Sequence, residues 1–284
     1  MEGNDCYKFS TIRNWVARTG APPVRVVMDV GANVGDVSRL AAHYFPDARV
    51  HAFEAVAELA EQARANLADL PNVRVDGRAV TAEHLFADDL GTRRRRRKAR
   101  LAVMRGTPES GPGWAGGSTV LPADHPLVAG AAEVRGYARS DQPVDAVTLD
   151  DAVAEVLRDA GADEMDVLKM DCEGCECSSL GCASEETLRR VRFIVGEYHG
   201  IERFHAVMRG KLFRTHKVSL IGDGALGAFF AERLDGEADG VLRFDKRGML
   251  VPRLWLCATP IDWHVFDDAF VLPEERAVHA LPPV

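Results

Sequence analysis

Two glycines and one acidic residue near the start of the chain have the spacing of a nucleotide site. Val26 to Val30 is a short, β-branched apolar run typical of a buried parallel strand. Gly31 and Gly35 follow it, and the residues from Asp36 onward have helical spacing. The first amides of that helix point at the turn, where they can bind a ligand. Glu54 ends the next predicted strand, near the ~20-residue distance typical of an acid that binds ribose hydroxyls.

The chemistry of this turn favours S-adenosylmethionine over a dinucleotide. A pyrophosphate site uses Gly-x-Gly-x-x-Gly, whereas this turn has Gly31-x-x-x-Gly35. Asp29, at the end of the first strand, would repel a phosphate but suits the ammonium group of an amino-acid moiety. We therefore expect S-adenosylmethionine, with Glu54 accepting hydrogen bonds from both ribose hydroxyls. The alternative is an ordinary strand-turn-helix unit with a surface acid.

A second set of reactive side chains follows the fourth and fifth predicted strands. Asp171, Glu173, Glu197 and His199 all lie where these strands end, and open α/β sheets bind ligands at that edge. We assign His199 as the base because an imidazole titrates near working pH, with Asp171 and Glu197 orienting acceptor or cofactor. In the alternative, Glu173 caps the next helix and His199 only satisfies a loop. We assign no metal, although hard cations seek such carboxylates and a divalent ion stays an option.

Strands and helices alternate in the order of a doubly wound, mostly parallel α/β sheet. We predict strands at residues 26–32, 49–54, 73–76, 166–171 and 192–199, with helices at 36–44, 56–67, 149–160, 175–180 and 184–191. Thr148 is the expected N-cap of the third of these helices. Two late strands, near residues 216–221 and 253–258, would form an antiparallel edge.

Residues 81–140 interrupt this alternation. They hold a basic run at 93–98, strand-like pieces near 100–104 and 133–137, and a glycine-rich stretch at 106–117. We interpret them as a hairpin and long loop, inserted at about 88–140, which shapes the substrate mouth. The basic run is either a solvated surface or a site for a phosphate or a carrier domain.

The composition, with 46% hydrophobic and 27% charged residues, is typical of a soluble globular protein. The formal charge of -8 argues against general nucleic-acid binding, and no apolar run reaches the ~20 residues of a membrane span. The first residues lack the pattern of a signal peptide, so we expect a cytoplasmic protein. Residues 1–23, with a helix at 11–18, form a segment that could act as a lid on one domain at 24–284.

Two further patterns resemble functional sites, but we interpret both as structural features. Cys172, Cys175, Cys177 and Cys182 are spaced for zinc or redox chemistry, but in a reducing compartment we expect thiols that pack as small hydrophobes. The segment Gly222–Gly227 satisfies Gly-x-Gly-x-x-Gly without a complete βαβ unit after it. We interpret that segment as a turn.

Six segments in order resemble the FkbM-type S-adenosylmethionine-dependent methyltransferases, a class I family. They are residues 29–35, 53–54, 116–119, 147–151, 166–174 and 195–199, and Leu168-Lys169-Met170-Asp171-Cys172-Glu173-Gly174 is the most specific of them. The resemblance covers roughly residues 26–200. It implies a Rossmann-like, seven-stranded sheet and methyl transfer, most often to a hydroxyl oxygen.

The resemblance also implies which residues meet the cofactor. The methionine end of the cofactor would be lined by Gly31, Asn33, Gly35, Asp36 and Val37. The ribose would lie at Glu54 and Ala55, and the adenine against Asp76, Ala79 and Val80. Further contacts would come from Ser118 and Asp171. We expect a bacterial enzyme of antibiotic or saccharide biosynthesis that methylates a hydroxyl of a small molecule, which a carrier could present. The alternatives are N-methylation of a similar molecule and a binding protein without catalysis.

Overall fold

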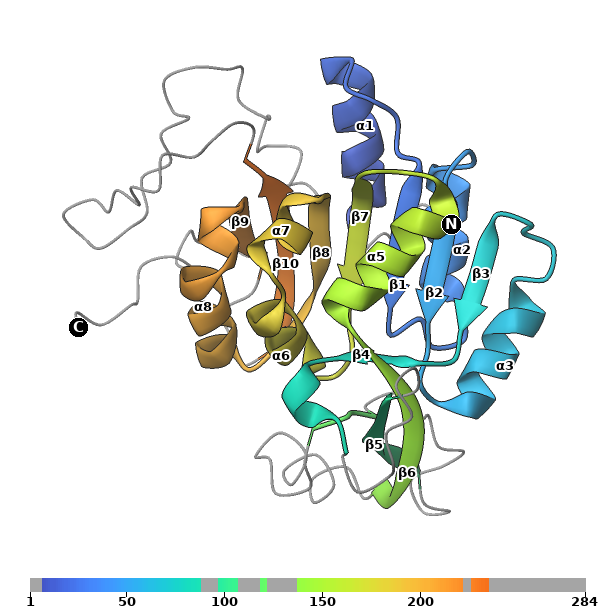
Figure 1. Cartoon of the computed structure of the whole chain (residues 1–284). Coiled ribbons are helices and arrows are strands. Elements are labelled where there is room, and N and C mark those ends of the chain that lie inside the picture. The colour runs from blue at the N-terminus through green and yellow to red at the C-terminus, as the bar shows by residue number, and fades with distance from the viewer. Residues whose placement is uncertain (1–6, 88–96, 107–117, 122–136, 222–225, 235–284) are drawn as a thin grey trace.

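The computed structural model describes residues 7–87, 97–106, 118–121, 137–221 and 226–234. In this part of the chain, seven strands form one sheet in the order β3-β2-β1-β7-β8-β10-β9 (Figure 1). The strands are β1 (Val26–Val30), β2 (Arg49–Phe53), β3 (Val73–Asp76), β7 (Met165–Met170), β8 (Val191–His199), β9 (His216–Ile221) and β10 (Leu226–Arg233). The first five are parallel, as the sequence predicts. The expected Rossmann-like α/β fold is therefore confirmed.

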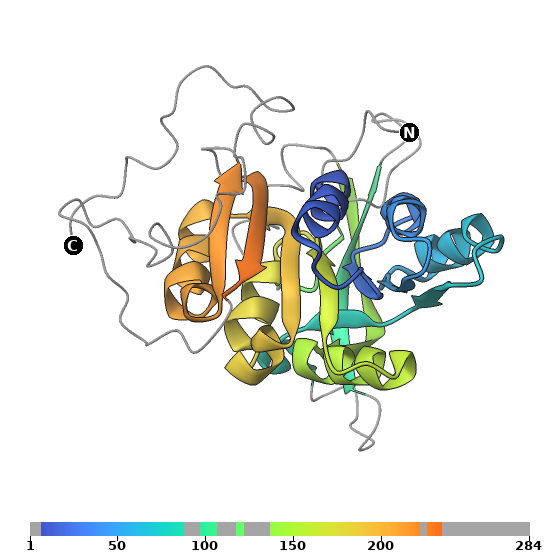
Figure 2. The same cartoon turned by 90° about the horizontal axis from the view of Figure 1, so that it is seen from above.

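Helices cover both faces of the sheet, as Figure 2 shows from above. One layer holds α1 (Phe9–Thr19) and α2 (Asp36–Tyr44), and the other holds α5 (Leu149–Ala160), α6 (Cys175–Cys182), α7 (Glu185–Arg189) and α8 (Ile201–Gly210). A further helix, α3 (Ala57–Asn66), joins β2 to β3. The β1 strand is buried on both sides, which explains its continuous apolar run. Each layer closes its own hydrophobic core against the sheet.

The inserted region forms a second, smaller sheet in the order β4-β6-β5. Its strands are β4 (Ala79–Thr81), β5 (Arg97–Gly106) and β6 (Tyr137–Thr148), and a short 3-10 helix, η2 (Glu83–Leu85), follows β4. The predicted strand near 100–104 lies within β5, whereas the one predicted near 133–137 falls outside the described residues except for Tyr137. The observed partner of β5 is β6, which begins at Tyr137 and runs to Thr148. That length lets β6 pair with β5 on one side and with β4 on the other. The long strand thereby ties the insertion to the main domain.

The far edge of the main sheet is antiparallel, as expected, with β10 pairing against both β8 and β9. The predicted strand at 216–221 is confirmed. Its partner is Leu226–Arg233, which the sequence analysis did not predict, and the strand predicted near 253–258 lies outside the described residues. Helix α8 and the 3-10 turn η4 (Leu212–Arg214) were also not predicted.

The predicted helix starts are accurate where a side chain caps the helix. Thr148 accepts a hydrogen bond from the Asp151 amide at 3.1 Å, and Ser184 accepts one from the Thr187 amide at 3.1 Å. Among the helices described, none is both long and apolar enough to cross a membrane.

Candidate functional site

The turn after β1 lies directly against the end of β7. Gly31 has φ +77°, and a Cβ atom on it would come within 1.8 Å of the Asp171 carbonyl oxygen. Only glycine fits such a turn, because it accepts a positive φ and leaves room for the neighbouring backbone. The two predicted site segments, which are distant in sequence, therefore meet at one edge of the sheet.

A buried ion pair holds this turn from behind. The Lys169 Nζ lies 3.0 Å from Asp29 Oδ1 and donates to the Gly31 carbonyl oxygen at 2.9 Å. Both side chains are 1% exposed, and Ser38 Oγ donates to the other Asp29 oxygen at 2.6 Å. Burial alone would lower the pKa of the Lys169 amine, but the charges of Asp29 and the nearby Asp171 outweigh burial and raise it.

This pair bears on the role that the sequence suggests for Asp29. We expect its carboxylate to meet the ammonium group of the cofactor. The structure places the carboxylate behind the turn, paired with Lys169 and outside the lining of the pocket. Its role at the ammonium group stays a prediction.

Glu54 stands at the end of β2 with both carboxylate oxygens hydrogen-bonded to backbone amides. Its Oε2 accepts from the Asn33 amide and its Oε1 from the Val56 amide, each at 2.8 Å. The residue is 8% exposed, and burial raises the pKa of its carboxyl group although the two amide bonds lower it. Because each carboxylate oxygen has a second lone pair, Glu54 can still accept hydrogen bonds from hydroxyl groups.

A pocket of about 390 Å³ opens along this edge of the sheet, a size typical of small-molecule sites. Of the predicted site residues, those that line it are Gly31, Asn33, Asp36, Val37, Glu54, Ala55, Ala79, Val80, Ser118, Asp171, Glu173 and Glu197. Asp29, Gly35, Asp76 and His199 do not line it. Asp76 is held instead by the Arg78 guanidinium, whose Nη2 lies 2.8 Å from its Oδ2. Arg78 itself lines the pocket, so the structure places Arg78 where we predicted Asp76.

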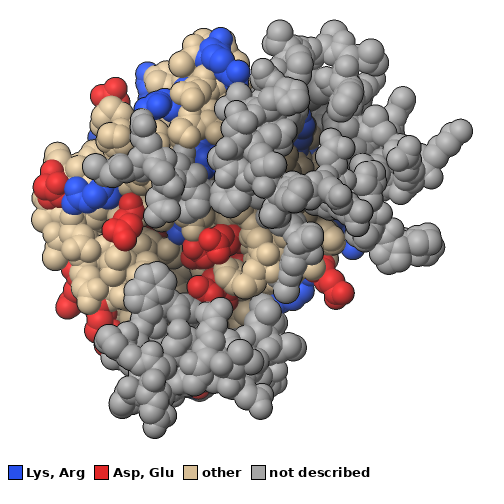
Figure 3. Space-filling view, turned by 180° about the vertical axis from the view of Figure 1, so that it is seen from behind, with Lys and Arg blue, Asp and Glu red and all other residues tan. Residues whose placement is uncertain are grey.

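Three further carboxylates, those of Asp171, Glu173 and Glu197, line the same pocket. Asp171 Oδ2 accepts a hydrogen bond from the Tyr7 hydroxyl at 2.7 Å. Burial raises the pKa of Glu197, and the negative charges of Asp171 and Glu173 raise it further. Acidic side chains also gather near the centre of the face drawn in Figure 3. A carboxylate with a raised pKa is better matched to accepting a proton near neutral pH.

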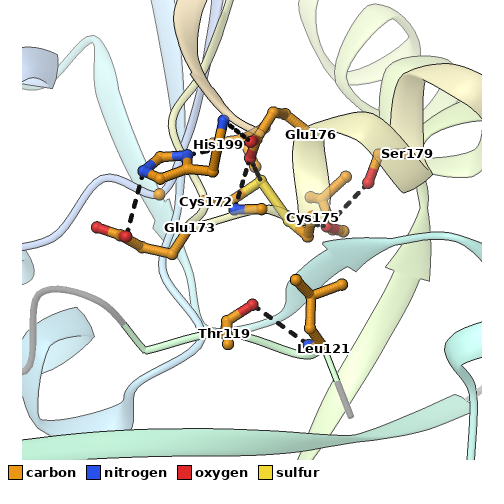
Figure 4. The surroundings of a disulfide bond; sticks show 12 residues. Thr119, Leu121, Cys172, Glu173, Cys175, Glu176, Ser179 and His199 are labelled. Carbon is orange, nitrogen blue, oxygen red and sulfur yellow. Dashed lines mark hydrogen bonds and ion pairs between the residues drawn. A yellow bond between two sulfur atoms is a disulfide. The ribbon is translucent and has the colours of Figure 1, made fainter. Parts of the chain in front are cut away.

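His199 lies behind these carboxylates, between two glutamates (Figure 4). Its Nδ1 is 3.0 Å from Glu176 Oε1, and its Nε2 is 3.2 Å from Glu173 Oε2. Burial lowers the pKa of His199, but the hydrogen bonds and charges of Glu173 and Glu176 outweigh it and raise the pKa to about 10. In this geometry the imidazole is protonated at neutral pH. His199 can act as a base only after it breaks from Glu173 and loses that proton.

The same arrangement bears on metal binding. Among the residues described, the ligand atoms of Asp171, Glu173 and His199 lie within 4.8 Å of one another. A histidine must be neutral to bind a metal, so a cation at this group would have to displace the ring proton that His199 directs toward Glu173 or Glu176. The assignment of no metal therefore stays a prediction.

The sequence matches the family described as Methyltransferase FkbM domain over residues 29–218. This chain belongs to the FkbM methyltransferase family. Similar solved structures include an O-methyltransferase from Bacillus cereus in complex with SAH (12% identity, 80% of each chain covered, TM-score 0.42). Another is a precorrin-6y C5,15-methyltransferase from Geobacter metallireducens (11% identity, 80% of this chain and 87% of that one, TM-score 0.40). A search of curated proteins finds no match.

The matched FkbM region contains every predicted site residue but not the segment before β1. Tyr7 belongs to that segment, lines the pocket, and was not predicted. Its aromatic type just before a helix was the only signal that could have drawn attention to it. Whether the segment moves as a lid stays a prediction, but its contact with Asp171 places it at the site.

The prediction that all four clustered cysteines are thiols is wrong for two of them. Cys172 and Cys175 form a disulfide with Cα atoms 5.5 Å apart, and both line the pocket (Figure 4). The spacing Cys-x-x-Cys at the start of a helix allows this bond, because the turn brings the two sulfur atoms together. Cys177 is a free, buried thiol, as expected, and Cys182 is free and exposed.

Proposed function

We propose that this FkbM-family protein is an S-adenosylmethionine-dependent methyltransferase that methylates a hydroxyl group of a small molecule. One observation carries the proposal: Glu54, the glycine turn and three carboxylates line a single pocket. Glu54 and the turn suit a ribose and the backbone of an amino acid, and the carboxylates suit a polar acceptor. A hydroxyl of a natural product or a sugar, free or carrier-bound, is the acceptor that this lining favours.

The residues of the pocket fit the cofactor on structural grounds. Gly31 and Asn33 line the pocket, and the Asn33 amide donates to Glu54 Oε2 at 2.8 Å, so the turn and Glu54 form one continuous part of the wall. Glu54 would accept from the ribose hydroxyls, and Ala79 and Val80 offer an apolar wall for the adenine. When bound, S-adenosylmethionine supplies an activated methyl group together with its own leaving group.

The protein must then align the acceptor and take its proton. Glu197 and Asp171 line the pocket and can accept a hydrogen bond from a hydroxyl. The raised pKa of Glu197 favours it as the acceptor of the proton at neutral pH. We therefore prefer Glu197 to His199 as the base, since the His199 side chain is already paired through both ring nitrogens.

Calorimetry with S-adenosylhomocysteine tests the proposed cofactor site. Replacing Glu54 with alanine removes two charge-assisted hydrogen bonds, each worth about 1.5–3 kcal/mol, so we expect the Kd to rise by roughly 100-fold or more. Glu61→Ala on the exposed side of α3 is the matched control and should leave the Kd unchanged. Equal affinity for wild type and Glu54→Ala would refute the ribose role.

Methyl transfer itself is tested with labelled S-adenosylmethionine and a panel of hydroxylated and aminated acceptors. Label on an oxygen supports the proposal, and label on a nitrogen favours the N-methyltransferase alternative. Tight binding of the cofactor with no transfer to any acceptor would favour a non-catalytic binding protein.

A further inference from the structure

Glu176, which the sequence analysis passed over, is a fully buried carboxylate beside the site. It is the second residue of α6 and is 0% exposed. Its Oε1 accepts from the His199 backbone amide at 2.8 Å, and its Oε2 accepts from the Gly174 amide at 2.9 Å. A buried carboxylate is costly unless donors surround it. Here two amides and the His199 ring supply those donors.

The contact with the ring determines which way His199 faces. Because Nδ1 lies 3.0 Å from Glu176 Oε1, this nitrogen donates its proton toward the interior, and Nε2 faces Glu173 at 3.2 Å. Glu173 lines the pocket, whereas Glu176 and His199 do not. The chain Glu176–His199–Glu173 therefore leads from the core of the protein to the wall of the pocket.

We propose that Glu176 is a positioning residue that orients the His199 imidazolium, and that His199 in turn holds the Glu173 carboxylate at the wall of the pocket. The positioning role rests on the contacts of His199 with Glu176 and Glu173 in the protein without ligand. Only the effect of Glu176 on turnover rests on the proposed methyltransferase function.

Two features support this chain over a simple helix cap. A cap needs only the bond from Glu176 to the Gly174 amide at the start of α6. The other oxygen is used entirely on His199, through its backbone and its ring. Glu173 also has φ +56°, a conformation that non-glycine residues rarely adopt, so its direction is set by its surroundings. The other charged groups nearby are Asp171, Glu197 and Lys169.

Nuclear magnetic resonance of ¹⁵N-labelled histidine tests the positioning directly on the free protein. In the wild type we expect His199 to be an imidazolium at about pH 7.5, consistent with the pKa of about 10 that its two glutamates produce. Glu176→Gln should lower this pKa toward the ordinary ~6.5 and move the Nδ1 signal. A His199→Gln sample assigns the resonance.

Thr148→Val is the matched control, because it removes a helix-capping bond at the start of α5, which involves none of His199, Glu173 and Glu176. We expect it to reduce stability without changing the His199 signals. If Glu176→Gln leaves the His199 pKa and Nδ1 signal unchanged, Glu176 is only a cap and the proposal fails. Should Glu176→Gln not fold, the wild type still decides, because a neutral His199 at about pH 7.5 would overturn the proposal.

Turnover gives the second test once an acceptor has been found. Glu176→Gln should lower kcat roughly 10- to 100-fold, the cost of a small misplacement of a reacting group, while the Kd for S-adenosylhomocysteine stays within about two-fold. An unchanged kcat would refute the positioning role. Loss of S-adenosylhomocysteine binding in the wild type would refute the proposed function instead, and would leave the His199 measurement valid.

Discussion

The ion pair between Lys169 and Asp29 makes a strong prediction about stability. Lys169→Met removes a cation that is 1% exposed and leaves the equally buried Asp29 carboxylate with Ser38 as its remaining donor among the contacts described. It also removes the donor to the Gly31 carbonyl oxygen. Breaking a buried pair from one side costs about 3–5 kcal/mol, because an uncompensated charge stays inside. That is a large part of the 5–15 kcal/mol that stabilises a typical domain.

Urea unfolding followed by circular dichroism measures this loss. In a thermal melt of a chain of this size, each kcal/mol lost from the free energy of unfolding lowers Tm by about 2–4 °C. A loss of about 4 kcal/mol therefore lowers Tm by roughly 8–16 °C. The double variant Lys169→Met with Asp29→Asn removes the unpaired charge and should regain about 2 kcal/mol over the single variant.

Lys211 provides the matched control for this experiment. Its ammonium group donates to the Ala183 carbonyl oxygen at 3.1 Å from a half-buried position. Lys211→Met should therefore cost only about 1 kcal/mol. If Lys169→Met loses no more than this control, or if the two changes at 29 and 169 are additive, the pair does not hold the turn and the reasoning is refuted.

Two further predictions concern the N-terminal segment and a buried histidine. Tyr7→Phe removes the donor to Asp171 and should lower the free energy of unfolding by about 1.5–3 kcal/mol in urea; no loss would mean that water replaces the hydroxyl. Burial lowers the pKa of His216 to about 4 although Val191 accepts a hydrogen bond from its ring. The unfolded chain then binds more protons between about pH 4 and 6.5, so stability falls over this range on acidification, by about 2–3 kcal/mol from this group. His216→Gln should lose less between pH 7 and 4.5 than wild type, and an equal loss would assign the acid sensitivity to other groups.

Local patterns predicted the elements that are stabilised by their own sequence. The β-branched run of β1, the capping residue Thr148 and the alternation up to β8 all carry their signal within a few residues. The strand Leu226–Arg233 carries a weaker signal because it follows a glycine-rich segment, and it becomes a strand by pairing with β8 and β9. The extension of β6 to Thr148 likewise depends on two partner strands.

The predicted site residues likewise divide into those that local sequence places and those whose role depends on partners distant in the chain. The spacing of Gly31 and Glu54 placed both of them in the pocket lining, because a strand-turn-helix unit fixes their relation locally. The partners of Asp29 and His199 could not be read from spacing, since Lys169 and Glu176 reach them only when β7 and α6 pack against other elements. Glu176 looks like a surface acid in a helix of small residues, and only its burial against β8 gives it a role.

The bond between Tyr7 and Asp171 sets the order in which this site can assemble during synthesis. The two residues are 164 positions apart, so at about 5–20 residues per second the ribosome makes Tyr7 roughly 8–33 s before it can reach its partner. During that interval Phe9 and Ile12 of α1, which are fully buried in the final fold, lack the later strands that help cover them. A nascent chain stalled before β7 should therefore expose this helix to chaperones, although its first strand and turn are already complete.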